Sequence, residues 1–135
     1  MVFKLITPEE ESQIFDKLFE YYQKIYPNFK FSRKEKLLSR NEIGNIFYTY
    51  SGEETEATAK EKMHDIEEAT RSGYKTPIII LQKKTGKLIL LDGHRRALFA
   101  YVHGIGWKAL VIQCDKSADF GIEKMIKKKV KDMAK

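Results

Sequence analysis

The amino-acid sequence predicts a single α/β (α+β) domain in which a small mixed sheet is flanked by helices. Amphipathic helical patterns alternate with short apolar runs rich in β-branched residues over the second half of the chain. The length of 135 residues suits one domain with a core of its own, and no repeat or low-complexity linker divides it. We expect residues 1–50 to form a helical N-terminal extension, packed on a core of residues 51–135.

The first helix is expected to begin at Thr7, whose hydroxyl suits an N-cap. Pro8 is favoured at the first helical position, and Glu10 completes a capping box. Apolar residues recur every three or four positions from Ile14 onward, and Pro27 stops the pattern. A long amphipathic helix is therefore predicted at the N-terminus.

The segment after this helix predicts one short helix and one strand. Ser32 and Glu35 form a second capping pattern, which favours a helix over residues 32–40. Residues 42–50 are rich in β-branched and aromatic side chains and predict a strand. An acidic loop at residues 51–58 then leads into the core.

The core begins with a long helix from Thr55 that ends at Gly73, a residue suited to a left-handed C-terminal position. Two apolar runs at residues 76–81 and 87–91 predict strands. The turn between them contains Gly86, so these strands should pair as a hairpin.

The last third of the chain predicts helix, strand and helix. The first helix covers residues 94–103 and stops at Gly104, and the strand covers residues 107–113. Ser117 is expected to cap a lysine-rich C-terminal helix. The apolar stripe of that helix would consist of Ile122, Ile126, Val130 and Met133.

Composition and charge place the chain among soluble globular proteins. Hydrophobic residues make up 42% and charged residues 33%, and no apolar run reaches the roughly 20 residues of a membrane helix. The single Cys114 excludes an intrachain disulfide, and together with the lack of a visible signal peptide this favours the cytoplasm. The net charge of +6 is concentrated in residues 116–135, with seven lysines against three acids. Such a helix is usually a solvated face, and nucleic-acid contact is the second interpretation.

Residues 92–96, with the sequence DGHRR, carry the chemistry of the chain. They follow an apolar strand and open a helix, where positive side chains are disfavoured because the macrodipole is already positive. An anion at this helix end explains the pattern. Gly93 permits close backbone approach, the first helical amides bind phosphate, and Arg95 and Arg96 add charge-assisted bonds.

The remaining two side chains of this motif have several expected roles. His94 can donate a hydrogen bond or transfer a proton near neutral pH. Asp92 can hold a basic side chain in place or coordinate Mg²⁺. A purely structural interpretation is also open, in which Asp92 caps the helix and the arginines pair with surface acids.

Residues 60–113 resemble the core of the ParB/sulfiredoxin superfamily, which includes the ParB-like nuclease domain. The shared pattern is a helix that ends in glycine, a proline-led strand, a hairpin, a strand that runs into a DGHRR-like motif, a helix, a glycine and a last strand. The resemblance implies that Gly93, His94, Arg95 and Arg96 bind the phosphates of a nucleotide. It also implies that Thr76, just before the proline, lies near the same pocket.

Departures from the family pattern separate its branches. Sulfiredoxins resemble this chain but carry a cysteine where it has His94, and partition proteins place a DNA-binding domain after this core. The chain is most similar to the archaeal free L-serine kinases, which have a stretch like residues 119–124 and a catalytic acid in the loop before the first core helix. That acid carries over to Glu53 or Glu54, and the spacing to Asp92 favours Glu53.

The resulting expectation is a phosphotransferase that uses ATP or ADP, with Mg²⁺, on a small hydroxyl substrate. In this hypothesis Glu53, Glu54, Asp92 and His94 are the candidate catalytic residues, and Asp92 is the candidate Mg²⁺ ligand. The alternative is a non-catalytic ParB-like module, or a nuclease, that binds nucleotide or nucleic acid. Its support is the basic C-terminal segment.

Overall fold

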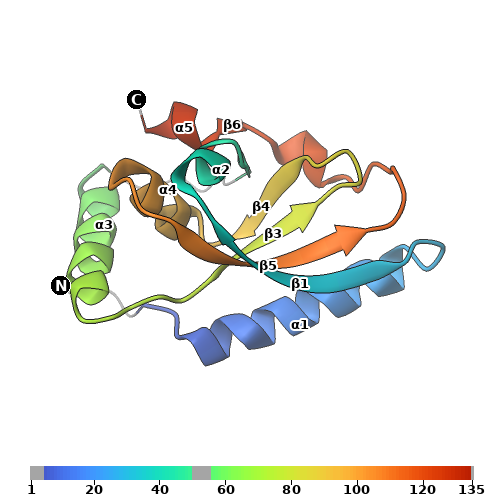
Figure 1. The fold of residues 1–135 in the computed structure, drawn as a ribbon, viewed down its shortest axis with the longest axis horizontal. Coiled ribbons are helices and arrows are strands. Elements are labelled where there is room, and N and C mark those ends of the chain that lie inside the picture. The colour runs from blue at the N-terminus through green and yellow to red at the C-terminus, as the bar shows by residue number, and fades with distance from the viewer. Residues whose placement is uncertain (1–4, 50–55, 135) are drawn as a thin grey trace.

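A six-stranded mixed sheet forms the centre of the fold (Figure 1). The computed structural model describes residues 5–49 and 56–134. The strands are β1 (Phe31–Leu38), β2 (Phe47–Tyr48), β3 (Ile78–Gln82), β4 (Leu88–Asp92), β5 (Trp107–Cys114) and β6 (Lys128–Lys129). The helices are α1 (Pro8–Ile25), α2 (Arg40–Gly44), α3 (Glu56–Arg71), α4 (His94–Val102), α5 (Val130–Met133) and the 3₁₀ helix η1 (Ile122–Met125). The predicted α+β class is confirmed, in the sense of a mixed sheet flanked by helices.

The strands lie in the order β1-β5-β3-β4-β2-β6. Three neighbouring pairs are antiparallel, namely β1 with β5, β3 with β4, and β2 with β6. The pairs β3 with β5 and β2 with β4 are parallel. The predicted hairpin of β3 and β4 is confirmed, and Gly86 in its turn has a φ of 93°. The short strands β2 and β6 lie at one edge and the long strand β1 at the other.

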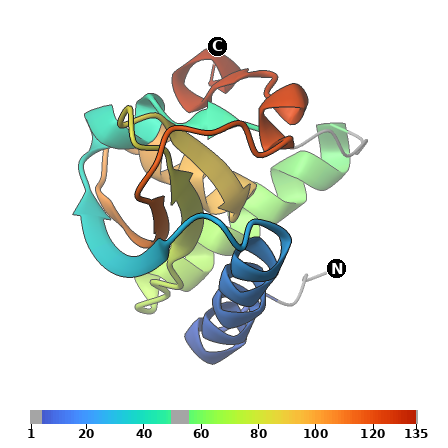
Figure 2. The same ribbon diagram turned by 90° about the vertical axis from the view of Figure 1, so that its right-hand side faces the viewer.

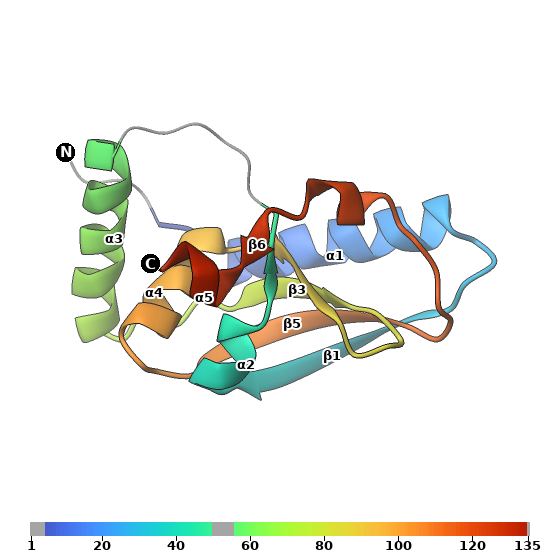
Figure 3. The same cartoon turned by 90° about the horizontal axis from the view of Figure 1, so that it is seen from above.

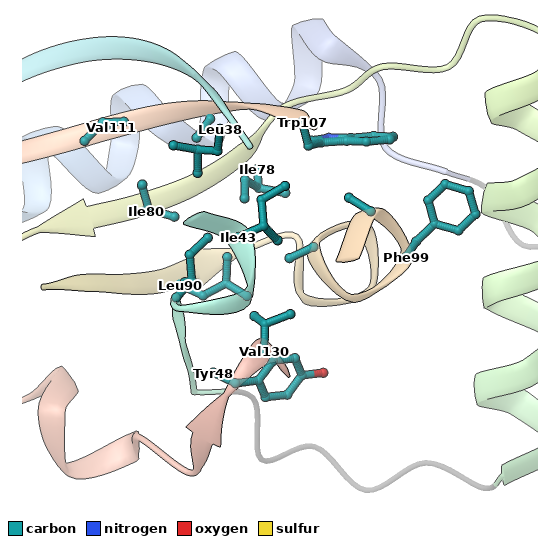
Figure 4. Packing of buried hydrophobic residues seen from close by; sticks show 14 of the residues in the cluster. Leu38, Ile43, Tyr48, Ile78, Ile80, Leu90, Phe99, Trp107, Val111 and Val130 are labelled. Carbon is teal, nitrogen blue, oxygen red and sulfur yellow. The ribbon is translucent and has the colours of Figure 1, made fainter. Parts of the chain in front are cut away.

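Helices cover both faces of the sheet. Helix α1 lies across one face, as the side view shows (Figure 2), whereas α2, α4 and α5 pack together on the opposite face. Helix α3 lies at one end of the sheet and packs against α4 (Figure 3). The first four residues of β3 are all apolar, which suits a strand buried on both faces: Ile79 and Leu81 pack in the core with α1, and Ile78 and Ile80 pack in the opposite core (Figure 4).

Helix α1 forms as its sequence predicts. Thr7 is the N-cap and forms a reciprocal capping box with Glu10, Pro8 is the first helical residue, and Ile25 is the last. Glu11, Phe15 and Tyr22 are its buried residues, so the helix packs on the sheet by one stripe.

The helix predicted over residues 32–40 is wrong, because this segment is the strand β1. Every residue of β1 pairs with β5, from Phe31 opposite Cys114 to Leu38 opposite Trp107. This long ladder outweighs the weak helical preference of the charged residues in the segment. A capping box is present, but it is formed by Ser39 with Glu42 and opens α2.

Part of the strand predicted over residues 42–50 is helical, since α2 ends at Gly44 and β2 covers Phe47–Tyr48. Of the helical extension expected at residues 1–50, α1 and α2 are helices, and β1 between them belongs to the central sheet.

The C-terminal helix predicted from Ser117 is also wrong. The segment forms η1, then β6, then the single turn of α5. Its apolar residues do not share one face: Ile122 and Ile126 pack in the core beneath α1, whereas Val130 and Met133 pack in the opposite core. A single helix at the sheet edge could not place these side chains in both cores, so the chain crosses that edge as a short strand.

Over residues 5–49 and 56–134, no helix is both long enough and apolar enough to cross a lipid bilayer.

Adjacent leucines distinguish strand from helix at β1. Leu38 is 1% exposed and Leu37 is 78% exposed. We expect Leu38→Ala to lower the free energy of unfolding by about 2–5 kcal/mol, because it opens a cavity in the core. Leu37→Ala should change it by less than about 0.5 kcal/mol. Urea unfolding of both variants measures the difference, and similar costs for the two would contradict the strand assignment.

Candidate functional site

A pocket of about 600 Å³ opens where β4 passes into α4. One side of this pocket is formed by the predicted motif, residues 92–96, and Lys62 of α3 contributes a second basic group. The remaining lining is apolar or aromatic and consists of Leu5, Ile6, Ile66, Tyr74 and Leu91. The lining therefore combines charged with apolar residues.

The turn at Gly93 places the start of α4 at this pocket. Gly93 is the N-cap of α4, with a left-handed backbone at φ 91° and ψ 34°. A Cβ atom here would lie 2.8 Å from Cγ2 of Ile78 and 2.9 Å from Nη2 of Arg96, so packing as well as backbone angle requires glycine. The first turn of α4 contains no acidic residue. Its amides and its dipole therefore present positive potential at the pocket.

The guanidinium of Arg96 points into the protein. Its side chain is 7% exposed, and Nη2 donates to Glu11 Oε2 at 2.6 Å and to Asp92 Oδ2 at 3.4 Å. Nη1 donates to the main-chain oxygen of Thr76 at 3.3 Å and to that of Pro77. Internal acceptors therefore occupy both Nη atoms of Arg96, which favours support of the turn from beneath over the predicted contact with phosphate.

The carboxyl of Glu11 completes this buried cluster. Its burial and a hydrogen bond with Asp92 raise the pKa of Glu11 well above its usual range, although the charge of Arg96 acts in the opposite direction. Oε1 of Glu11 is buried and has no hydrogen-bond partner within the described chain. A Glu11 that keeps its proton adds no negative charge beside Arg96. The cluster then adds no net negative charge to the pocket.

His94 is neutral at pH 7. Nε2 lies 3.1 Å from the hydroxyl of Thr49, and that hydroxyl donates its proton to the main-chain oxygen of Leu90 at 2.7 Å. The hydrogen-bond network therefore assigns the proton of His94 to Nε2. Burial lowers the pKa of His94 to about 4, and its ring also packs edge-on against Tyr48 at 4.9 Å. The sequence predicts that His94 donates a hydrogen bond or transfers a proton near neutral pH. The ring donates to Thr49, and its lowered pKa disfavours the protonated form at neutral pH.

Two further cations line the pocket. Arg95, in the first turn of α4, and Lys62, on α3, both line it and are partly buried. They come from elements that pack together, since α3 contacts α4. An anion between the two helices would meet a guanidinium, an ammonium and the amides of α4.

Thr76 does not line the pocket. Thr76 is fully buried, and its hydroxyl donates to the main-chain oxygen of Ile6 at 2.9 Å. Its own carbonyl accepts from Arg96 and from Nε1 of Trp107, so Thr76 organises the floor of the site instead of facing a ligand. Glu53 and Glu54 lie outside the described residues.

The described residues leave little choice of metal ligand. No group of three or more His, Cys, Asp or Glu residues suited to a metal occurs among them. Asp92 is 37% exposed and lines the pocket. One carboxylate together with ligand phosphates is a usual environment for Mg²⁺, so Asp92 fits as a protein ligand of a phosphate-bound ion.

Three residues of the site were missed in the sequence, and two of them left a signal. Glu11 precedes the buried Phe15 by four positions, which places a carboxyl on the apolar stripe of α1. Lys62 precedes the buried Ile66 by four positions, on the inner face of α3. Thr49 left no comparable signal, because its contact with His94 depends on how β2 and β4 pair.

Comparisons with family models, with curated proteins and with solved structures found no match for this chain.

The buried contact between Glu11 and Arg96 can be tested by a mutant cycle. We expect Glu11→Ala and Arg96→Ala each to lower the free energy of unfolding by about 1–3 kcal/mol or more, because each leaves a buried hydrogen-bonding partner unsatisfied. The double variant should lose clearly less than the sum of the two. The exposed pair of Arg71 and Glu67 is the control, and Arg71→Ala should cost less than about 0.5 kcal/mol. Additive effects at Glu11 and Arg96 would contradict the direct coupling.

The lowered pKa of the buried His94 predicts that the protein loses stability in acid. Its pKa is about 4 in the folded protein and about 6.5 when unfolded, so the unfolded state binds the extra proton between these values. Between pH 7 and pH 4.5 the wild type should lose about 2–3 kcal/mol more than His94→Gln, which keeps a donor for Thr49 but does not titrate. Urea unfolding at both pH values measures this. Equal losses in the two proteins would show that His94 is not buried as a neutral ring.

Proposed function

We propose that this protein is a nucleotide-dependent phosphotransferase acting on a small hydroxyl compound, of the kind implied by its resemblance to the free L-serine kinases. The observation that carries the proposal is the pocket at the start of α4. It joins a helix whose first turn has no acidic residue to Arg95 and Lys62, and its lining also contains apolar and aromatic side chains. ATP and ADP have the same two parts, a polyanion and a flat, weakly polar base.

The electrostatics of the pocket favour a polyphosphate. The raised pKa of Glu11 keeps its carboxyl neutral, and the carboxyl of Asp92 pairs with Arg96 at 3.4 Å, so this cluster does not oppose an anion. Arg95 and Lys62 then add to the positive end of the α4 dipole. Phosphoryl transfer depends chiefly on such positioning and charge stabilisation.

The apolar part of the pocket lining suits the base of a nucleotide. Ile66 and Tyr74 are among the apolar and aromatic residues of the lining. An aromatic ring and aliphatic side chains bury a heterocycle without requiring further charge. The pocket of about 600 Å³ lies within the range of small-molecule sites.

The chemistry requires an acceptor for one proton. The substrate hydroxyl oxygen would bond to the terminal phosphorus while the bond from that phosphorus to the bridging oxygen breaks, and the hydroxyl proton would pass to a carboxylate. Asp92 borders the pocket, and Glu53 and Glu54 precede α3, one of its walls. Glu53 remains our preferred base. Mg²⁺ held by Asp92 and the phosphates would supply neutralising charge.

A second candidate is a module that binds nucleotide or nucleic acid without turnover, or that cleaves nucleic acid. The lysine-rich segment at the edge of the sheet favours it. Retained nucleotide affinity without transfer to any acceptor would select the non-catalytic form.

Nucleotide affinity tests the site. Arg95→Ala and Lys62→Ala should each weaken the binding of ATP or ADP by roughly 10–100-fold, since a charge-assisted bond contributes about 1.5–3 kcal/mol. Arg71→Ala is the matched control, because it removes an exposed cation at the far end of α3. Isothermal titration measures all three variants. Wild-type affinity in both pocket variants would place the nucleotide elsewhere.

The transfer reaction tests the function on the same proteins. Labelled ATP or ADP is incubated with Mg²⁺ and a panel of small hydroxyl compounds that includes free serine. The wild type should label at least one acceptor, whereas Glu53→Gln should bind nucleotide normally and transfer none. Failure of the folded wild type to label any acceptor would exclude the proposed activity.

A further inference from the structure

The strongest unassigned feature of the molecule is a run of lysines at one edge of the sheet. Residues 124–131 contain five lysines and no acid. These lysines are distributed over η1, β6 and the start of α5. Lys87, the residue before β4, belongs to the same surface, because its ammonium and that of Lys129 both lie over the ring of Phe47. We call this surface the basic strip; its members are Lys87, Lys124, Lys127, Lys128, Lys129 and Lys131.

The ammonium groups of the basic strip have no acidic partners within the described part of the chain. Lys124, Lys127, Lys128 and Lys131 are exposed, and among the described residues no carboxylate forms an ion pair with any of them. The nearby carboxylate of Glu123 has other partners: it pairs with Lys83 at 3.6 Å and accepts a hydrogen bond from the main-chain N–H of Phe120 at 2.8 Å.

The strip keeps its shape because the backbone beneath it is held by the sheet. Lys127 donates its main-chain N–H to the oxygen of Tyr48 at 2.8 Å, and Lys128 pairs with Tyr48 across the strands. Lys129 lies opposite Phe47, so its ammonium and that of Lys87 lie 5.4 and 4.5 Å from the centre of that ring. Because side chains alternate along a strand, lysines stand on both sides of this edge.

The strip adjoins the candidate site. Tyr48, which pairs with Lys128, also packs against the ring of His94 at 4.9 Å. Tyr48 therefore lies between the strip and the start of α4. A row of lysines of this length suits a long anion better than a single phosphate.

Protection of the sheet edge does not account for the strip. Lysines on edge strands prevent association of sheets, but a short edge strand already does so. The strand β6 has two residues, and the lysines extend several residues beyond it on both sides.

We propose that the basic strip binds the phosphate backbone of nucleic acid without reading its bases. Unpaired lysines on an ordered surface contact phosphates and release counterions. Base reading is not expected, because Phe47 is partly buried and flanked by two ammonium groups, which leaves its ring unsuited to stacking. The proposal does not depend on the phosphotransferase activity.

The test compares two triple variants with the same change of charge. Lys127→Ala/Lys128→Ala/Lys131→Ala removes exposed members of the strip and spares the lysines that pack on Phe47. The control, Lys17→Ala/Lys24→Ala/Lys34→Ala, removes three exposed lysines from α1 and β1. Fluorescence anisotropy with a labelled 20-nucleotide single strand and a 20-base-pair duplex, each in two unrelated sequences, measures affinity from 50 to 200 mM salt.

We expect the wild type to bind at 50 mM salt with little sequence preference. The strip variant should lose at least about 10-fold in affinity, and its salt dependence on the duplex should fall by roughly one unit of slope per lysine removed. The control should bind within about 2-fold of the wild type. Arg95→Ala should keep oligonucleotide affinity, and the strip variant should keep ATP affinity, which separates this surface from the pocket.

Three results would overturn the proposal. The wild type could fail to bind either oligonucleotide at 50 mM salt. The control could weaken binding as much as the strip variant does, which would assign the effect to bulk charge. Poly-glutamate or vesicles with anionic lipid could bind as tightly as nucleic acid and with the same dependence on the strip, which would identify an acidic protein or a membrane surface as the partner class.

Discussion

The buried guanidinium of Arg96 is the constraint on which the site depends. It joins three parts of the chain: Glu11 on α1, the carbonyls that precede β3, and the turn that opens α4. Because the guanidinium packs against the turn, position 93 has no room for a side chain. Helix α1 therefore does more than cover a face of the sheet, since it supplies the acid that keeps Arg96 in place.

This constraint divides the basic motif into unlike parts. Arg96 supports the turn from within, His94 is a neutral ring bonded to Thr49, and Arg95 faces the pocket. The second cation at the pocket comes from α3 as Lys62. The same three letters, HRR, thus cover a hydrogen-bonding ring, a structural ion pair and a candidate ligand group. Their roles are separated by depth of burial, because a buried charge must find an internal partner.

Local sequence signals correctly predicted the elements that are defined by short-range interactions. The capping box of α1, the glycine before α4 and the hairpin of β3 with β4 all follow from short-range rules. The wrong predictions concern segments whose secondary structure depends on a partner that is distant in the sequence. The segment 31–38 is a strand because β5 offers it a complete ladder, and residues 117–133 are broken because their apolar side chains serve two different cores.

The sequence by itself determined the α+β class, the succession of elements from α3 to β5, and the location of the motif at a helix start. These depend on periodicity and on residues with special backbone preferences, which act over a few positions. Tertiary structure alone decided which arginine turns inward, that Glu11 and Lys62 belong to the site, and that the C-terminal lysines line a sheet edge. The physical reason is that burial and charge pairing depend on neighbours far away in the chain, and local patterns do not record those neighbours.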